Sequence, residues 1–171
     1  MTANHVFTFD NRPENITQCS RTILAYLEPL LTENGQSRAL LLRAKFIVGE
    51  LLNNAVKHSG TEKTDIEVNL EEKVLTINKI DTGAPFNLVS KIEKQDAQLI
   101  VSSDVMHLLY AIKKDENSVS FFCKENLTFE LDVNKLAEHL GLLIITKAAD
   151  EFTYHYHQPT NIFTVKLNLS R

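Results

Sequence analysis

The sequence predicts an α/β (α+β) two-layer sandwich, in which a mixed, mostly antiparallel sheet carries helices packed on one face. Apolar and polar residues alternate in two neighbouring stretches within 66–80, and again in two stretches within 152–169. Long helical patterns lie between these pairs of strands. Strands joined by short turns pair in antiparallel fashion, and the helices between them then cover one face of the sheet.

The N-terminal third is predicted to contain one strand and two helices. A short strand is expected at 6–9, where Val6, Phe7 and Phe9 precede a turn signal. Pro13 suits the first turn of a helix, whose apolar residues recur at helical spacing as far as Leu31. Pro29 kinks this helix or ends it. A second helix is expected over 37–58, because Ser59-Gly60 is a typical stop.

The remaining elements are predicted in chain order. Two strands at 66–70 and 74–80 are joined by a tight turn. The middle of the chain is expected to be helical and then extended, and a further helix and a hairpin follow it. The corresponding ranges are 88–116 for the helical part, 119–122 and 127–131 for the extended segments, 134–149 for the helix, and 152–156 with 163–169 for the hairpin.

Composition favours one soluble domain over residues 1–171, because the chain is too short for two sizeable cores. The net charge of −4 argues against a nucleic-acid partner, since such proteins carry basic patches. Cys19 and Cys123 lie far apart in the sequence, without the spacing of a metal or redox motif. We therefore expect them to be free thiols in a reducing compartment. Neither a signal peptide nor an apolar run long enough for a membrane span is visible, so we expect a cytoplasmic protein.

The helix predicted over 37–58 carries a polar face. Glu50, Asn54 and Lys57 lie within roughly 60° of one another on it, at about 100° per residue. A carboxylate one turn from an amide can deprotonate a nucleophile while the amide oxygen binds Mg²⁺. Lys57 can meet a phosphate as a point charge. The alternative is the solvated side of an amphipathic helix, although Asn53-Asn54 is a poor choice for a helix interior.

A second group follows the strand at 74–80, in the sequence Asp81-Thr-Gly83. An aspartate at a strand end, close to a glycine, provides a fixed acceptor beside a permissive backbone. Such an aspartate can accept a hydrogen bond from an exocyclic amine. The alternative is an ordinary loop with an Asx-type turn.

Together, the two groups resemble the asparagine box and the first glycine box of the GHKL superfamily of histidine-kinase-like ATPases. The stretch ELLNNAVKHS is most similar to the stand-alone anti-sigma-factor serine kinases. The resemblance extends from the first strand to the last hairpin. It implies a Bergerat-type sandwich with ATP and Mg²⁺ as cofactors.

The resemblance also implies roles for individual residues. Glu50 matches the catalytic general base, Asn54 the ligand of Mg²⁺, and Asp81 the residue that bonds the adenine amino group. Gly83 matches the glycine that lets the base approach the backbone. Pro85 stands where the family has a second glycine, which is a departure from the pattern.

The phosphate side of the motif set is only partly present. Lys57 and His58 are implied to lie toward the phosphates of the nucleotide. Gly141 matches the second glycine of the segment that opens the helix after the ATP lid, while His139 stands where the first is expected. Asn161 falls where a threonine usually reaches the adenine site. A helix N-terminus normally holds phosphate through its backbone N–H groups, and glycines permit the close approach.

Two functions from different classes remain open. The first is an ATP- and Mg²⁺-binding protein kinase of the anti-sigma type that phosphorylates serine or threonine on a regulatory partner protein. The second is a degenerate GHKL fold without turnover that acts as an interaction module. Residues 88–133 are expected to be an atypical insertion in the lid region, able to cover the pocket, fill it or bind a partner. A homodimer is left open by the sequence.

Overall fold

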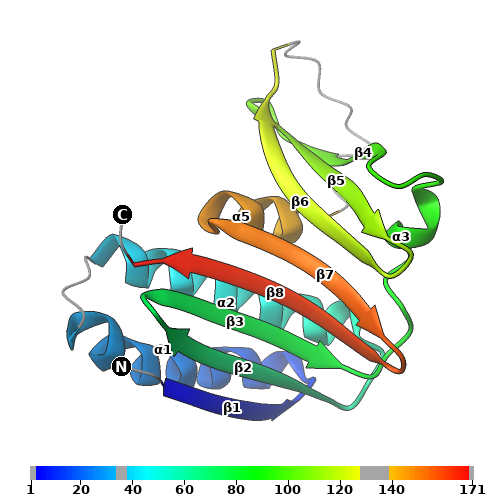
Figure 1. The fold of residues 1–171 in the computed structure, drawn as a ribbon. Coiled ribbons are helices and arrows are strands. Elements are labelled where there is room, and N and C mark those ends of the chain that lie inside the picture. Colours follow the sequence, from blue (N-terminus) through cyan, green and yellow to red (C-terminus); the bar gives the residue numbers. More distant parts are fainter. Residues whose placement is uncertain (1–2, 34–37, 128–138, 170–171) are drawn as a thin grey trace.

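The structure, a computed structural model, describes residues 3–33, 38–127 and 139–169 (Figure 1). Its eight strands form one sheet in the order β1-β2-β3-β8-β7-β6-β5-β4, and every pair is antiparallel. The long helices α1, α2 and α5 lie on one side of this sheet, which confirms the predicted sandwich. The elements are β1 (Ala3–Asp10), η1 (Pro13–Asn15), α1 (Ile16–Glu33), α2 (Arg38–His58), β2 (Lys63–Glu71), β3 (Val74–Asp81), α3 (Leu88–Lys91), β4 (Gln98–Ser103), β5 (His107–Asp115), β6 (Ser118–Glu125), α5 (Leu140–Ala148), β7 (Glu151–His157) and β8 (Thr160–Asn168).

Both ends of the chain fold as their local patterns predict. The first strand, the two N-terminal helices, the β2–β3 pair and the C-terminal β7–β8 hairpin are all present. Pro29 lies inside α1 and does not end it, because the helix continues to Glu33.

The helix predicted over 88–116 is wrong. Only the single turn of α3 is helical there, and β4 and β5 follow it. β5 carries apolar residues on both faces: Leu109 and Ala111 are buried toward the helices, and Leu108, Tyr110 and Ile112 are half-buried on the other side. Such a strand loses its period-two alternation, and its apolar run then resembles a helix.

The three strands β4, β5 and β6 form a meander that extends the sheet beyond β7. Only four residue pairs join it to β7, from Ser118↔His155 to Phe121↔Phe152. Figure 1 shows the meander reaching past the helical layer, with α5 behind its junction with β7. The extended segment predicted at 127–131 lies outside the described residues from 128 onward. The helix predicted over 134–149 is described from 139, and its helical part is α5.

The core lies between the sheet and the helices, and β3 shows how it leads to the site. Its buried face carries Leu75 and Ile77 and then Lys79 and Asp81, so the face changes from apolar to charged along a single strand. Asn161 of β8 is buried opposite Asp81. A buried polar surface therefore forms at one end of a hydrophobic core.

Candidate functional site

The polar face of α2 lines a cavity of about 710 Å³, a volume typical of small-ligand sites. The opposite face of the helix packs into the core through residues such as Ile47 and Leu51. Glu50 and Asn54 are half-buried in the cavity wall, one helical turn apart. Lys57 and His58, at the exposed C-terminal end of α2, line the same cavity.

The first turn of α5 lies against these two polar side chains. A Cβ placed on Gly141 would come within 2.7 Å of Glu50 Oε2 and 3.3 Å of Asn54 Oδ1. Glycine at this position therefore allows α5 to approach the polar face of α2. His139 precedes the helix with a φ of 65°, a left-handed conformation that glycine adopts more readily. The backbone thus keeps a glycine-like shape at the position where the family has glycine.

The Glu50 carboxylate is partly withdrawn from water in this wall. Burial raises its pKa above the usual value, and the positive charge of Lys57 on the same helix partly opposes that effect. A carboxylate with a raised pKa is a stronger base than one that is fully solvated.

The opposite wall of the cavity is a network of buried polar side chains around Asp81. Asp81 Oδ1 accepts hydrogen bonds from the Gly83 backbone N–H at 2.9 Å and from Asn161 Nδ2 at 3.0 Å. Asp81 Oδ2 forms an ion pair with the Lys79 ammonium, and both side chains are almost fully buried. Asn161 Nδ2 also donates to the carbonyl oxygens of Gly83 and Ala84. Asn161 therefore holds Asp81 and the loop after β3 in place.

Gly83 is required by packing within the wall. A Cβ on this residue would lie 1.8 Å from the backbone oxygen of Ser59, so no other residue fits without moving the α2–β2 connection. Gly83 does not itself line the cavity. The loop after β3 and the end of α2 are thus packed backbone against backbone.

Tyr154 of β7 extends the network. Its hydroxyl donates to Asn161 Oδ1 at 2.7 Å and accepts from the Phe86 backbone N–H at 2.9 Å. Burial raises the pKa of this hydroxyl, so it stays protonated as a donor. The chain of hydrogen bonds from Phe86 through Tyr154 and Asn161 fixes the orientation of the Asp81 carboxylate.

The structure brings seven of the eight predicted site residues to one cavity, namely Glu50, Asn54, Lys57, His58, Asp81, Gly141 and Asn161. Gly83 lies just behind the wall. Lys79 and Tyr154 also belong to the site and were not predicted from the sequence. The sequence does contain a signal for Lys79: it lies two residues before Asp81, and alternate residues of a strand point to the same face. Tyr154 had no such signal, since its partners come from distant parts of the chain.

A comparison with protein families agrees with this geometry. A family model described as histidine kinase-like ATPase domain matches residues 11–167. The chain belongs to the histidine kinase-like ATPase domain family. The expected superfamily is therefore confirmed, and the match spans every element that lines the cavity of this ATPase domain. A comparison with curated proteins finds no match.

The residues of this histidine kinase-like ATPase domain fit a magnesium nucleotide. Asn54 Oδ1 is a hard oxygen atom that could bind Mg²⁺, and it lies close to the glycine-opened start of α5. The described residues contain no cluster of three His, Cys, Asp or Glu side chains that could hold a metal by themselves. A site with one or two protein oxygens is typical of Mg²⁺ that is bound together with phosphates.

Among the helices described, none combines the length and the apolar character needed to cross a membrane. The lid region expected at 88–133 is described as far as residue 127. None of the residues 88–127 lines the cavity. The described part of the predicted insertion therefore contributes no lining residue; it forms α3 and the meander of β4, β5 and β6, and Phe121 of β6 packs against the lining residue Phe86.

Proposed function

We propose that this ATPase domain binds Mg-ATP in the cavity and transfers the γ-phosphoryl group to a serine or threonine of a partner protein. One observation carries the proposal: Glu50 and Asn54 of α2, Asp81 of β3 and Gly141 of α5 meet around a single cavity. These elements are far apart in the sequence, so the meeting is a property of the fold. An activity that consumes ATP and acts on a regulatory protein belongs in the cytoplasm.

The proposed roles are those that the family resemblance implies, and the positions of the residues in the cavity walls support them. Asp81 accepts a hydrogen bond from the base, while Lys57, His58 and the first turn of α5 lie on the phosphate side. Glu50 takes the proton of the acceptor hydroxyl as that oxygen attacks the γ-phosphorus and ADP leaves with its bridging oxygen. Mg²⁺, when bound, would be held through Asn54 and the phosphates and would neutralise part of the phosphate charge.

Nucleotide binding is tested by thermal unfolding with and without Mg-ATP. A ligand at 100 times its Kd stabilises a protein by about 2.7 kcal/mol, which corresponds to a rise in Tm of roughly 5–10 °C for a domain of this size. We expect this rise in the wild type and its loss in Asp81→Ala. The matched control is Asp115→Ala, at the exposed end of β5, which should keep the rise. No rise in the wild type at millimolar Mg-ATP contradicts the proposal.

Phosphoryl transfer is tested separately with Glu50→Gln, which keeps the size of the side chain and removes the base. The chain is incubated with γ-thio-ATP and a protein extract of its source cells, and thiophosphorylated serine and threonine residues are mapped by mass spectrometry. Kinases of the extract also use γ-thio-ATP, so the extract alone gives the background. We expect proteins modified above this background with the wild type and none above it with Glu50→Gln, although the variant still binds Mg-ATP.

A second candidate function is nucleotide binding without transfer, as a regulatory module. The observation that favours it is His139, whose ring stands at the cavity wall where a glycine is expected. Binding of Mg-ATP with no protein labelled above the background of the extract alone would support this second function over the first.

A further inference from the structure

A buried lysine stands in the base-side wall of the cavity. Lys79 is 3% exposed, and its ammonium pairs with Asp81 Oδ2. The same ammonium lies 5.0 Å from the centre of the Phe163 ring, which lines the cavity beside it. Lysine is almost never fully buried unless it is paired. Its place beside Asp81 therefore calls for an explanation.

Packing does not require a charge at this position. Leu75 and Ile77 precede Lys79 on the same buried face of β3, so an apolar side chain would continue that face. Replacing a buried ion pair by apolar residues is often neutral or even stabilising. The Lys79–Asp81 pair is accordingly explained better by a ligand than by stability.

The hydrogen bonds of the wall leave a defined set of free sites. A carboxylate offers about four lone-pair positions. Asp81 uses two at Oδ1, for Gly83 N–H and Asn161 Nδ2, and one at Oδ2, for Lys79. One acceptor position remains at Oδ2. The ammonium has three protons, and among the described residues its hydrogen-bond acceptor is Asp81, which leaves donors for a ligand.

We infer that Lys79 is a base-specificity residue, whose ammonium donates to ring nitrogen N1 of adenine while Asp81 Oδ2 accepts from the 6-amino group. This inference rests on the proposed function, because it places a purine nucleotide in the cavity. Adenine presents one donor and one acceptor side by side, which matches one free acceptor and one ammonium proton. Guanine in the same orientation reverses both groups, because its O6 acceptor would face Asp81 Oδ2 and its N1–H donor would face the Lys79 ammonium. Both contacts would then be unpaired, which is costly in a buried site.

The sharpest test changes the ligand and leaves the protein intact. In 1-deaza-ATP a C–H group replaces N1, and the 6-amino group is kept. Binding of Mg-ATP and of Mg-1-deaza-ATP is measured by titration calorimetry. We expect 1-deaza-ATP to bind about 10-fold more weakly than ATP, or weaker still, because it lacks the acceptor for a hydrogen bond from a charged group. GTP is expected to bind more weakly than ATP for the reason given above.

The protein side of the test uses Lys79→Met, which keeps an unbranched side chain without a donor. This variant should bind ATP about as weakly as the wild type binds 1-deaza-ATP, and it should no longer distinguish the two nucleotides. Lys79→Arg retains a hydrogen-bond donor and should still bind ATP more tightly than 1-deaza-ATP. It replaces Lys79→Met in the test if the methionine variant fails to fold. Lys166→Met removes an ion pair with Glu151 outside the cavity lining and is the matched control, with discrimination unchanged.

The outcomes separate the two proposals. No binding of ATP by the wild type overturns the proposed function and this inference with it. Binding of ATP and 1-deaza-ATP with equal affinity overturns the inference alone. Discrimination that persists in Lys79→Met also overturns it, because another group then contacts N1. Tighter binding of ATP by Lys79→Met overturns it too, since Lys79 would then compete with the base for Asp81.

Discussion

Glu50 shows what a folded environment does to one side chain. In the sequence it is an ordinary glutamate on the polar side of a helix, and in the structure it stands against Gly141 with part of its water removed. Burial raises its pKa, because the charged form loses hydration. The same effect that suits a base therefore costs stability, since the folded protein must hold a carboxylate in a poor environment.

This cost has a defined dependence on pH. A carboxyl whose pKa is raised by folding destabilises the folded state once it ionises in the unfolded chain, above its ordinary value of 4.5. The penalty grows until the pH passes the raised value and then stays constant. We therefore expect Glu50→Gln to be more stable than the wild type at neutral pH, with the difference vanishing at about pH 4 and below. Urea denaturation over a pH series measures it.

Glu116→Gln, in the exposed β5–β6 turn, is the matched control, because no buried charge is removed there. A stability gain in Glu50→Gln that persists unchanged at low pH would contradict the assignment to desolvation.

At the scale of elements, the start of α5 decides how closely that helix meets α2. His139 has a φ of 65° immediately before the helix, and Leu142 and Leu143 donate backbone hydrogen bonds to its carbonyl oxygen. A residue other than glycine costs about 1–3 kcal/mol in a strained backbone region, and β-branched side chains are the worst suited. The position tolerates histidine but is shaped for glycine.

We expect His139→Val to be less stable than His139→Gly by about 1–3 kcal/mol. Both variants remove the ring that packs against Phe86, so their difference isolates the backbone conformation. Chemical denaturation of the two variants side by side measures it. Equal stability would show that α5 can begin without a left-handed residue at this position.

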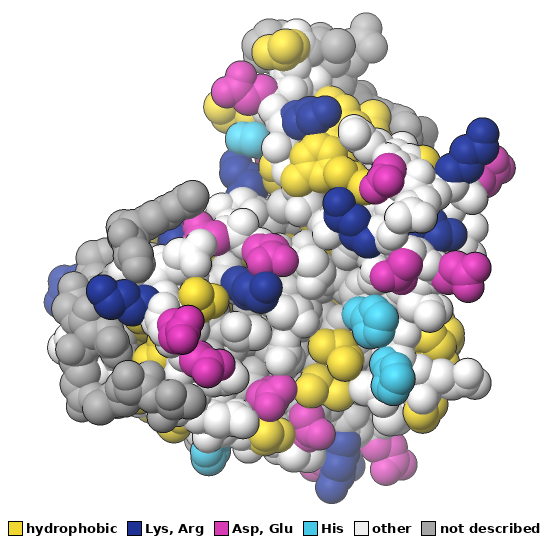
Figure 2. Space-filling model, viewed as in Figure 1, with side chains coloured by type: hydrophobic (Ala, Val, Ile, Leu, Met, Phe, Trp, Pro, Cys, Tyr) yellow, Lys and Arg dark blue, Asp and Glu magenta, His cyan; other side chains and the backbone are white. Residues whose placement is uncertain are grey.

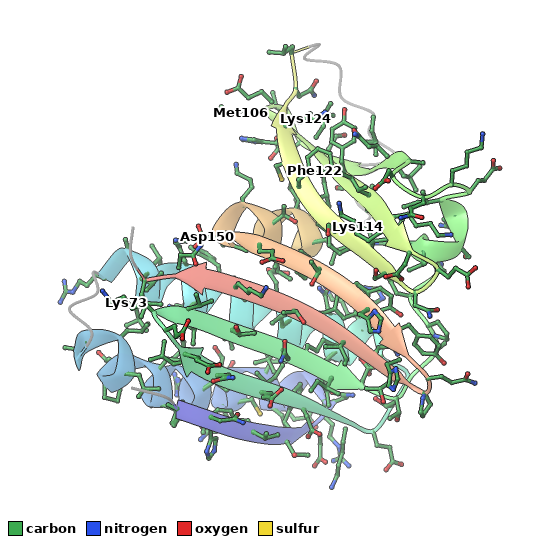
Figure 3. The ribbon with its side chains drawn as sticks, viewed as in Figure 1. Lys73, Met106, Lys114, Phe122, Lys124 and Asp150 are labelled. Carbon is green, nitrogen blue, oxygen red and sulfur yellow. The ribbon has the colours of Figure 1, made fainter. Side chains whose placement is uncertain are left out.

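At the scale of the whole molecule, all the described strands form one sheet, and its β4–β6 part is joined to the rest by few residue pairs. The β4–β6 meander joins β7 through four residue pairs, and buried residues of β5 and β6 continue the core there. Phe121 is buried at this junction and stacks on Phe152, with 4.6 Å between ring centres. Its neighbour Phe122 is half-buried on the other face and stacks on Tyr110, and Figure 2 shows hydrophobic side chains gathered over the meander. Figure 3 labels Phe122 there, beside Lys124, whose ammonium lies 5.3 Å from its ring centre.

These two neighbouring phenylalanines test whether the meander shares the core. Phe121→Ala should lower the free energy of unfolding by about 3–5 kcal/mol, because it opens a cavity at the junction. Phe122→Ala should cost only about 1 kcal/mol, chiefly the stacking with Tyr110. Urea denaturation followed by circular dichroism and by fluorescence measures both. A small loss in Phe121→Ala, or two separate transitions in the wild type, would indicate that the meander folds independently.

The sequence by itself determined the elements whose cause is local. The helices α1 and α2, the β2–β3 pair and the final hairpin follow from periodicity and turn residues, and all of them are present. The polar face of α2 and the position of Asp81 at the end of β3 followed from the same spacing. These features depend on neighbours within a few residues, which a sequence displays directly.

Only the tertiary structure decided what depends on distant neighbours. The strands β4 and β5 resembled a helix in the sequence, because β5 is apolar on both faces, and the meander joins the sheet only through the pairing of β6 with β7, which comes later in the chain. Tyr154 belongs to the site because its hydroxyl meets Asn161 and Phe86. Lys79 became a candidate once its ammonium was seen buried against Asp81. Burial and hydrogen-bond partners are set by packing between elements, and packing follows from the whole chain and not from any local stretch.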